Sequence, residues 1–319
     1  MTDRRSARTS TDLRSPRRAA LLVLVAGCAL AACAGPAGRT PTSAAVAGQP
    51  SDSVTATADT GTAADTEPAG TVAPALTECT GGMLPTQTPG ALTVATAEPA
   101  AAPWFTPGNP TSGEGLESSV AYAIADVLGY PHDQVSWTLV DRASALSGQA
   151  TDFDLDLSQF TANELTTAAA DASTGYFAVT DAVVVLAGGP TPTTVSGLPR
   201  PLGALADPAD DDSLPAGLAT TPVGDTPADA IQALRDGAVQ AVVLPTPVAI
   251  ALAQADTGLT VAGQLPPDPR VQPKQFQVLL AAGSALTGCV SSAIDRLRVE
   301  GSLAELADQW VTPLAPLLS

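Results

Sequence analysis

The sequence predicts an α/β protein built as two lobes with a central cleft between them. Beyond about residue 78, short apolar runs typical of strands alternate with amphipathic segments typical of helices, as in α/β proteins. The proline-rich stretch 190–201 then separates a first alternating unit from a second one. Two such units joined by extended crossings favour a ligand-binding cleft at their junction.

The first unit is expected to begin with a strand followed by an amphipathic helix. Val120, Ile124 and Val127 recur at helical spacing, and Gly129 is placed to end that helix. The later runs either alternate polar and apolar residues or are continuously apolar, as in a buried strand. The expected elements are a strand at 92–96, a helix at 117–128, strands at 135–140 and 153–157, and a buried strand at 182–186.

The second unit carries clearer helix boundaries. Thr226 and Pro227 form a start signal and Gly237 a stop signal. Ser302 and Glu305 have the spacing of a capping box for the last helix. The expected elements are a strand at 202–206, a helix at 227–236, strands at 239–244 and 276–281, and helices at 286–299 and 303–310.

Residues 1–33 have the pattern of a lipoprotein signal peptide. Basic residues ending at Arg17 and Arg18 precede the apolar run 19–26, which is too short to span a bilayer comfortably. The run continues to Leu30-Ala31-Ala32-Cys33, which resembles the bacterial lipobox, so Cys33 is the expected lipidation site and Cys28 the second candidate. A cleaved signal peptide with incidental cysteines is the alternative, and both Sec and twin-arginine export stay open. We therefore expect an extracytoplasmic protein that is lipid-anchored to the cell membrane.

Residues 34–77 are expected to form a disordered tether. They consist mainly of Ala, Thr, Ser, Gly and Pro, without an aromatic residue or an apolar period. Such a segment cannot bury enough apolar surface to offset the entropy lost on ordering.

The charge balance argues against a nucleic-acid partner. The 319 residues include 14 Lys and Arg against 32 Asp and Glu, for a formal net charge of -18. Phosphate backbones are bound through clustered Lys and Arg, which an acidic chain does not offer.

Cys79 and Cys289 stand near the two ends of the expected folded part. A disulfide between them is the simplest use of two cysteines in an exported chain, and two buried free thiols are the alternative.

A search for catalytic or metal-binding residues gives no constellation, so we expect neither an enzyme nor a cofactor. The single histidine, His132, is expected in a loop, and the sequence contains no Gly-x-Ser-x-Gly nucleophile elbow that could use it as a base. Asp152, Asp154 and Asp156 imitate the start of an EF-hand loop, but Leu157 stands where glycine is needed. We expect these aspartates on a solvated strand edge or cleft wall.

Several segments together resemble the family 3 extracellular solute-binding proteins, the amino-acid-capturing subunits of ABC importers, and most closely their actinobacterial lipoprotein branch. The segments run in order through residues 103–105, 115–125, 153–156, 171–173, 176–177, 237–243, 286–290, 301–303 and 310. The resemblance implies a type II periplasmic-binding fold that closes on a ligand, with crossings near 182–187 and 276–281. It gives lobe 1 as 78–186 and 277–319, and lobe 2 as 187–276.

The resemblance breaks at the positions that hold an amino acid in the family. Thr166 stands where the family has the arginine that binds the carboxylate, and Pro245 where it has the aspartate that binds the ammonium group. Asp207 and Pro208 fall near a Gly-Thr-Thr turn, where proline has no amide to donate. Trp104, Phe105 and Glu117 remain as cleft candidates, with core packing as the alternative for the two aromatics.

These departures lead to a functional expectation. We expect a lipid-anchored solute-binding protein that works with an ABC permease and captures a small solute other than an ordinary α-amino acid. A neutral or cationic molecule would suit an acidic cleft poor in arginine. The alternative is a degenerate binding fold that serves as a surface sensing or protein-interaction module.

Overall fold

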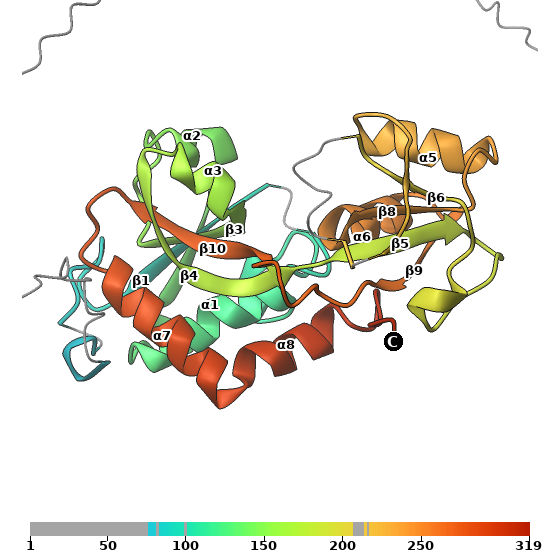
Figure 1. Cartoon of the computed structure of the whole chain (residues 1–319). Coiled ribbons are helices and arrows are strands. Elements are labelled where there is room, and N and C mark those ends of the chain that lie inside the picture. Colours follow the sequence, from blue (N-terminus) through green and yellow to red (C-terminus); the bar gives the residue numbers. More distant parts are fainter. Residues whose placement is uncertain (1–75, 81–82, 99–100, 207–213, 216) are drawn as a thin grey trace, which may run out of the picture. The chain divides into compact units, whose positions relative to one another are not determined.

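The computed structural model describes residues 76–80, 83–98, 101–206, 214–215 and 217–319. All of them lie within one compact unit that begins at Asp65. The unit contains two five-stranded mixed sheets with their helices, which are lobe 1 and lobe 2 (Figure 1). The predicted two-lobed α/β fold is confirmed. The expected signal peptide, Cys28, Cys33, nearly all of the tether and Asp207 lie outside the described residues.

Lobe 1 contains a sheet of strand order β2-β1-β3-β10-β4. Its strands are β1 (Leu92–Ala97), β2 (Val135–Val140), β3 (Leu155–Thr161), β4 (Ala170–Val179) and β10 (Lys274–Ala281). Strand β1 is parallel to β2 and β3, whereas β10 is antiparallel to β3 and β4. Lobe 1 is therefore assembled from two parts of the chain that are far apart in sequence.

Lobe 2 contains a sheet of strand order β7-β6-β8-β5-β9. Its strands are β5 (Asp181–Leu186), β6 (Leu202–Ala204), β7 (Thr221–Pro222), β8 (Ala241–Pro245) and β9 (Leu259–Gln264). Strand β5 is antiparallel to both β8 and β9. The continuous apolar runs of β5 and β8 fit this central position, because side chains are buried on both faces of the sheet.

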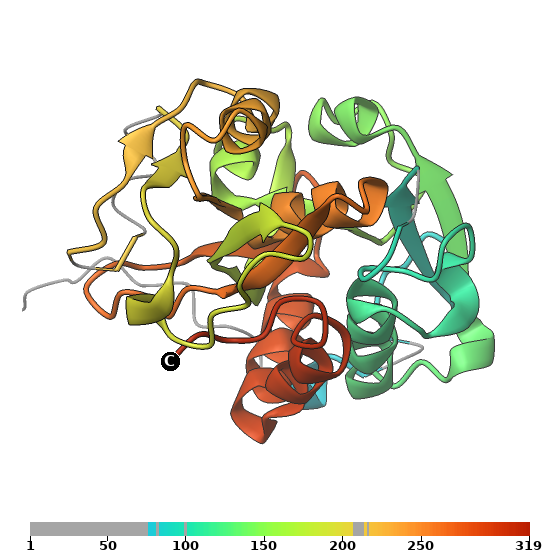
Figure 2. The same ribbon diagram turned by 90° about the vertical axis from the view of Figure 1, so that its right-hand side faces the viewer.

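Helices cover both faces of the lobe 1 sheet. They are α1 (Leu116–Val127), α2 (Arg142–Leu146), α3 (Ala162–Thr166), α7 (Thr287–Glu300) and α8 (Ser302–Trp310). On one face, α1, α7 and α8 enclose the larger core, which includes Ile124, Val278 and Ile294 (Figures 1 and 2). On the other face, the core of Phe153, Phe160 and their neighbours underlies α2 and α3.

In the part of lobe 2 that the structure describes, the α-helices lie on one face of the sheet. Helices α5 (Pro227–Arg235) and α6 (Thr246–Ala255) pack their apolar sides on that face. The start of α5 is stabilised as the sequence predicts, because Thr226 and Asp229 cap each other's backbone amides. On the opposite face, the core includes Leu198, Leu265 and Leu318, which lie outside the helices.

The chain crosses between the lobes at Thr180 and again within 265–273, and its end returns to lobe 2 after α8. The end of the chain bonds to lobe 2, since the Ser319 amide donates to the Thr193 carbonyl oxygen (Figure 2). The first crossing therefore precedes β5 rather than lying near 182–187 as expected, and residues 181–186 belong to lobe 2 rather than to lobe 1. An apolar pattern indicates burial of a strand but does not identify the sheet that buries it. The second crossing likewise ends at Lys274, slightly earlier than expected.

A disulfide joins Cys79 to Cys289 of α7, as the sequence analysis predicted. Both residues belong to the larger core of lobe 1. The bond therefore fastens the first described residues to lobe 1.

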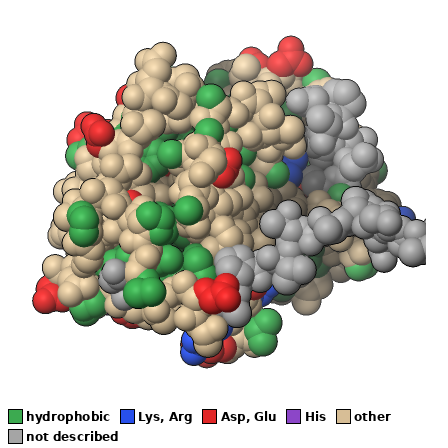
Figure 3. Space-filling view, turned by 90° about the vertical axis from the view of Figure 1, so that its left-hand side faces the viewer, with side chains coloured by type: hydrophobic (Ala, Val, Ile, Leu, Met, Phe, Trp, Pro, Cys, Tyr) green, Lys and Arg blue, Asp and Glu red, His purple; other side chains and the backbone are tan. Residues whose placement is uncertain are grey.

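The face of lobe 1 that lies on the left in Figure 1 carries scattered charges. Figure 3 shows acidic side chains dispersed among uncharged ones, and basic side chains at few places among the described residues of this view. That distribution agrees with the formal net charge of -18.

Candidate functional site

A pocket of about 520 Å³ is lined by residues of both lobes. Its lobe 1 wall comes from the end of β1, the end of β3, the start of α3 and the adjoining ends of β4 and β10. Its lobe 2 wall consists of Pro245, Pro247 and Val248, at the end of β8 and the start of α6.

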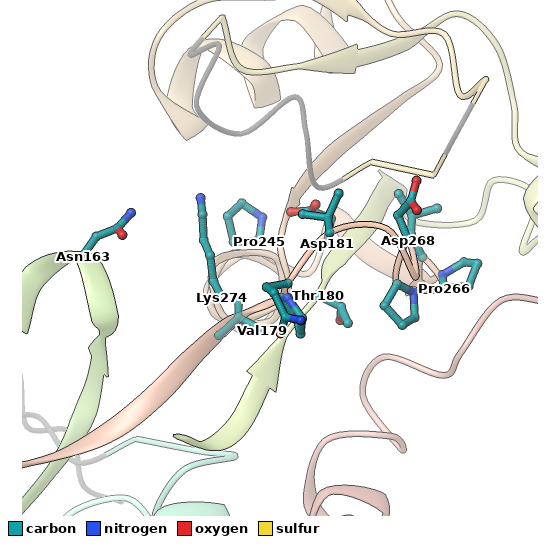
Figure 4. Close-up of a pocket in the computed structure, with 13 residues that line it drawn as sticks. Asn163, Val179, Thr180, Asp181, Pro245, Pro266, Asp268 and Lys274 are labelled. Atoms are coloured by element: carbon teal, nitrogen blue, oxygen red, sulfur yellow. The ribbon is translucent and has the colours of Figure 1, made fainter. Parts of the chain in front are cut away.

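A second pocket of about 240 Å³ lies at the crossings (Figure 4). Asn163, Val179, Pro245 and Lys274 line both pockets, so the two pockets adjoin, and we call them together the groove. In Figure 4, the side chains of Lys274 and Asp181 rise from the crossing strands, and Asn163 stands opposite them on α3.

The two walls of the groove differ in chemistry. Lobe 1 contributes Arg142, Glu164, Ser158 and other polar side chains to the larger pocket. Lobe 2 contributes two prolines and a valine among the described residues. Because proline has no backbone N–H, this wall offers few hydrogen-bond donors. In the larger pocket the polar side chains therefore come mainly from lobe 1, whereas in the smaller pocket Asp181, at the start of β5, adds a carboxylate from lobe 2.

Arg142 occupies the polar wall. Its Nη1 donates to the Ser158 carbonyl oxygen, and its Nη2 donates to the Gln159 carbonyl oxygen at 3.4 Å and to Glu164 Oε1 at 2.7 Å. The guanidinium carbon lies 4.3 Å from the centre of the Phe160 ring, within the range of a cation–π contact. The Arg142 guanidinium is thus engaged by protein groups on several sides.

The end of β3 is bent where Arg142 meets it. Gln159 has a φ of 57°, a left-handed conformation that is uncommon for residues other than glycine. The β3–β10 ladder shifts register at this point, because Phe160 pairs with Gln277 while Asp156 pairs with Leu279. Such a bulge takes backbone groups out of the ladder. The carbonyl groups of Ser158 and Gln159 can therefore accept from Arg142.

Buried Glu117 stabilises this bend through a hydrogen bond to the backbone of Gln159. Its carboxylate accepts the Gln159 amide at 2.7 Å and the Tyr176 hydroxyl, and the side chain is fully buried. Burial raises the pKa of Glu117 to about 7, although the hydrogen bonds from Tyr176 and Gln159 lower it. Burial also raises the pKa of Asp156 to about 6, against the lowering effects of Ser158 and Arg142.

Gln264 connects the three passages of chain between the lobes. Its side-chain oxygen accepts from Thr180 Oγ1 at 2.7 Å, and its side-chain nitrogen donates to the Ala315 carbonyl oxygen at 2.6 Å. Thr180 Oγ1 also lies 3.0 Å from Thr246 Oγ1, at the start of α6. Since Thr180 lines the smaller pocket, this cluster holds one side of the groove in place.

The structure brings together only part of the expected site. Phe105 lines the larger pocket, and Pro245 lines both pockets. Trp104 is buried with edge-on contacts to Phe177 and Phe276, so it belongs to the core. Glu117 is absent from the described pocket linings and lies beneath the wall.

Thr166 lies away from the groove. It is exposed, it is absent from the described pocket linings, and its hydroxyl donates to the Ala162 carbonyl oxygen at 2.7 Å. Asp154 and Asp156 also differ from expectation, because both are buried rather than solvated. Asp154 accepts the Gln87 and Thr93 amides, which explains its burial.

Sequence reasoning missed Arg142, Gln159 and Lys274. Lys274 is the single lysine of the chain and follows a proline-rich stretch. That stretch could have indicated the crossing between the lobes. No local pattern marks Arg142, because its partners lie 16 to 22 residues further along the chain.

Two other possibilities receive no support from the described residues. Among them, no group of three or more His, Cys, Asp or Glu side chains is arranged to hold a metal ion. The helices within the described ranges are all too short or too polar to cross a membrane.

The two lobes, their crossings and the groove between them define a two-lobed protein with a pocket of small-molecule size between its lobes. Residues 92–313 match the bacterial extracellular solute-binding proteins of family 3, and the chain belongs to this family. The predicted family and its type II periplasmic-binding fold are thereby confirmed. Comparison with curated proteins gave no match.

Several solved structures are similar to this chain. The arginine-, lysine-, histidine-binding protein of Geobacillus stearothermophilus is 20% identical, with 69% of this chain and 94% of that chain covered and a TM-score of 0.40. The L-cystine solute receptor of Neisseria gonorrhoeae is 19% identical, with 69% and 92% covered and a TM-score of 0.46. An ancestral cyclohexadienyl dehydratase is 18% identical, with 70% and 92% covered and a TM-score of 0.47.

Proposed function

We propose that the chain captures a small solute in the groove and delivers it to an ABC permease. The observation that carries this proposal is a pocket of about 520 Å³ lined by both lobes beside the crossings. A ligand in this pocket would contact both walls at once. It would therefore favour the conformation in which both lobes are in contact with it. We propose binding without chemical transformation, as is typical of solute-binding proteins.

The departures at the two amino-acid positions support a solute other than an ordinary α-amino acid. Thr166 stands where the family arginine is expected, and its hydroxyl is bonded to the Ala162 carbonyl oxygen. Pro245 offers no carboxylate for an ammonium group. Arg142 lines the groove, but Glu164 already pairs with it. A neutral or cationic small molecule fits these walls better than a zwitterion.

Thermal unfolding of the purified chain tests solute capture. The panel contains sugars, polyols, polyamines and α-amino acids, each added alone. A ligand specific for the folded state, present at about 100 times its Kd, stabilises by about 2.7 kcal/mol. A saturable shift with a compound that is not an α-amino acid supports the proposal. A strong shift with ordinary α-amino acids contradicts the solute class, and no shift with any compound favours the sensing or interaction module.

We further propose that Cys33 carries the lipid anchor, as in the actinobacterial lipoprotein branch of the family. Detergent phase partitioning of the chain expressed in an actinobacterial host tests this. Cys33→Ala should move the protein from the detergent phase to the aqueous phase, and the matched variant Cys28→Ala should stay in the detergent phase. The reverse result would assign the anchor to Cys28. A wild-type chain that already partitions to the aqueous phase would indicate an ordinary cleaved signal peptide.

A further inference from the structure

The groups around Arg142 have the composition of a binding site for a guanidinium ion. Two backbone carbonyl groups and one carboxylate accept hydrogen bonds from its N–H groups. The centre of the Phe160 ring lies 4.3 Å from the guanidinium carbon. Charge-assisted hydrogen bonds and aromatic faces are the groups that bind such cations in proteins. In this chain, the cation that occupies them is a side chain of the protein itself.

These acceptors are built into the fold rather than met by chance. The left-handed Gln159 and the register shift between β3 and β10 free the Ser158 and Gln159 carbonyl groups. Buried Glu117 holds the Gln159 amide at 2.7 Å, and Phe160 is fully buried. Glu164 is also fixed, because its second oxygen accepts the Thr161 amide at 2.8 Å as part of a capping box.

The charge of Arg142 is balanced at the same place. Glu164 faces it directly at 2.7 Å. Asp156 is buried close enough to interact with its charge. Both Arg142 and Glu164 line the larger pocket, with about a third of each side chain exposed. The guanidinium group therefore repels a second cation from this part of the larger pocket. The carboxylates of Glu164 and Asp156 repel an anion.

We propose that the lobe 1 wall contains a guanidinium subsite occupied by Arg142, which makes the groove selective for solutes that are uncharged where they meet this wall. Oxygen-rich solutes such as sugars, polyols and amides fit, because their oxygens can accept N–H groups without adding charge. This solute class depends on the proposed function, since it presumes that the groove captures a solute. The occupied subsite does not depend on it.

Removal of the Arg142 side chain tests the subsite directly. Arg142→Ala should open a cavity bordered by the same acceptors, and methylguanidinium at millimolar concentration should raise the Tm of this variant saturably, relative to sodium chloride of equal ionic strength. The wild-type chain should show no such rise. Arg235→Ala is the matched control, because Arg235 pairs with Asp256 outside the groove, and it should not respond.

Two results would overturn the subsite: an equal response of the wild-type chain, or no response of folded Arg142→Ala. Should Arg142→Ala not fold, Glu164→Gln provides the test, because glutamine retains the capping box while removing the balancing charge. Acetate should then raise the Tm of Glu164→Gln and leave that of the wild-type chain unchanged. Equal responses of the two proteins to acetate would contradict the charge balance.

The solute panel separates this inference from the proposed function. Rescue by methylguanidinium together with a wild-type shift for an uncharged compound supports both. Rescue without a shift from any solute keeps the subsite and rejects solute capture. A wild-type shift for polyamines or other cations, with none for their uncharged analogues, rejects the uncharged class and leaves solute capture intact.

Discussion

The two walls of the groove achieve complementarity in different ways. The lobe 1 wall is polar, and its charges are compensated within the protein, as the Arg142–Glu164 pair shows. In the larger pocket the lobe 2 wall presents Pro245, Pro247 and Val248, which offer shape and few hydrogen-bond donors, and in the smaller pocket lobe 2 adds the Asp181 carboxylate. Lobe 1 is therefore expected to determine which polar groups are accepted in the larger pocket. Lobe 2 is expected to determine which shapes fit.

The lobes also differ in how they are held together. Lobe 1 has a disulfide and a buried network of Glu117, Tyr176 and Gln159 behind its wall. Lobe 2 is held by its apolar core and by the end of the chain, where Leu318 is buried. The polar wall thus rests on the more strongly cross-linked lobe, which suits a surface whose hydrogen-bonding groups must stay in register.

Among the changes considered, removal of the disulfide should cause the largest loss of unfolding free energy, and this loss should fall mainly on lobe 1. The double variant Cys79→Ser, Cys289→Ser should lose about 4 kcal/mol of unfolding free energy, because native disulfides of this kind contribute roughly 2–5 kcal/mol. Hydrogen exchange should show protection lost earlier in α7 than in β8. Equal losses in both lobes would contradict the comparison. Reducing agent should reproduce the loss in the wild-type chain and leave the double variant unchanged.

Removal of the buried carboxylate should change the pH dependence of stability. Glu117 has a pKa of about 7 in the folded protein and an ordinary value of 4.5, so the folded state retains a proton that the unfolded state has lost. Wild-type stability should therefore fall as pH rises from 4.5 to 7, by roughly 3 kcal/mol from this group. Below pH 4.5 and above pH 7 this contribution should be level.

The variant Glu117→Gln isolates that contribution. The difference in unfolding free energy between variant and wild type should shift in favour of the variant across this pH window, measured by urea unfolding at several pH values. Glu305→Gln, on the exposed side of α8, controls for the loss of one negative charge. A constant difference for Glu117→Gln across the window would show that Glu117 is ionised in the fold throughout.

How far the sequence predicts this molecule differs between its fold and its site. Helix α5 was located to within one residue, because its capping residues are local signals. Strand β4 was missed, since Ala, Ser and Thr dominate it and no apolar period marks it. The disulfide was predicted because only two cysteines remain beyond the leader.

The polar wall could not be predicted in the same way. Arg142 meets Ser158 only because β3 bends at Gln159, and that bend depends on buried Glu117, which is 42 residues away in sequence. A local pattern carries no information about such partners. The resemblance to the family located Thr166 and Pro245 in the alignment, but it could not reveal that an arginine from another helix fills the wall.

A smaller effect should follow from crowding the end of the chain against lobe 2. A Cβ atom at Gly263 would lie 2.6 Å from the Pro316 carbonyl oxygen and 2.8 Å from Leu318. Gly263→Ala should therefore cost about 1–3 kcal/mol by overpacking. In a chain that ends at Ala315 the same substitution should cost far less, because the crowding atoms are gone. An equal cost in both chains would place the strain elsewhere in β9.

The smallest effect on stability, and the sharpest test of the apolar wall, should come from Pro245. This residue is the N-cap of α6 and makes no side-chain cap bond. Pro245→Asp should gain a cap worth about 1 kcal/mol and lose a similar amount of proline rigidity, for a net change within about 0.5 kcal/mol. Pro245→Asn should cap the helix as well without adding charge.

Because the new carboxylate would face the groove, methylammonium should raise the Tm of Pro245→Asp more than that of Pro245→Asn. Equal responses would mean that the lobe 2 wall does not contact small solutes in the groove, and that lobe 1 alone recognises them.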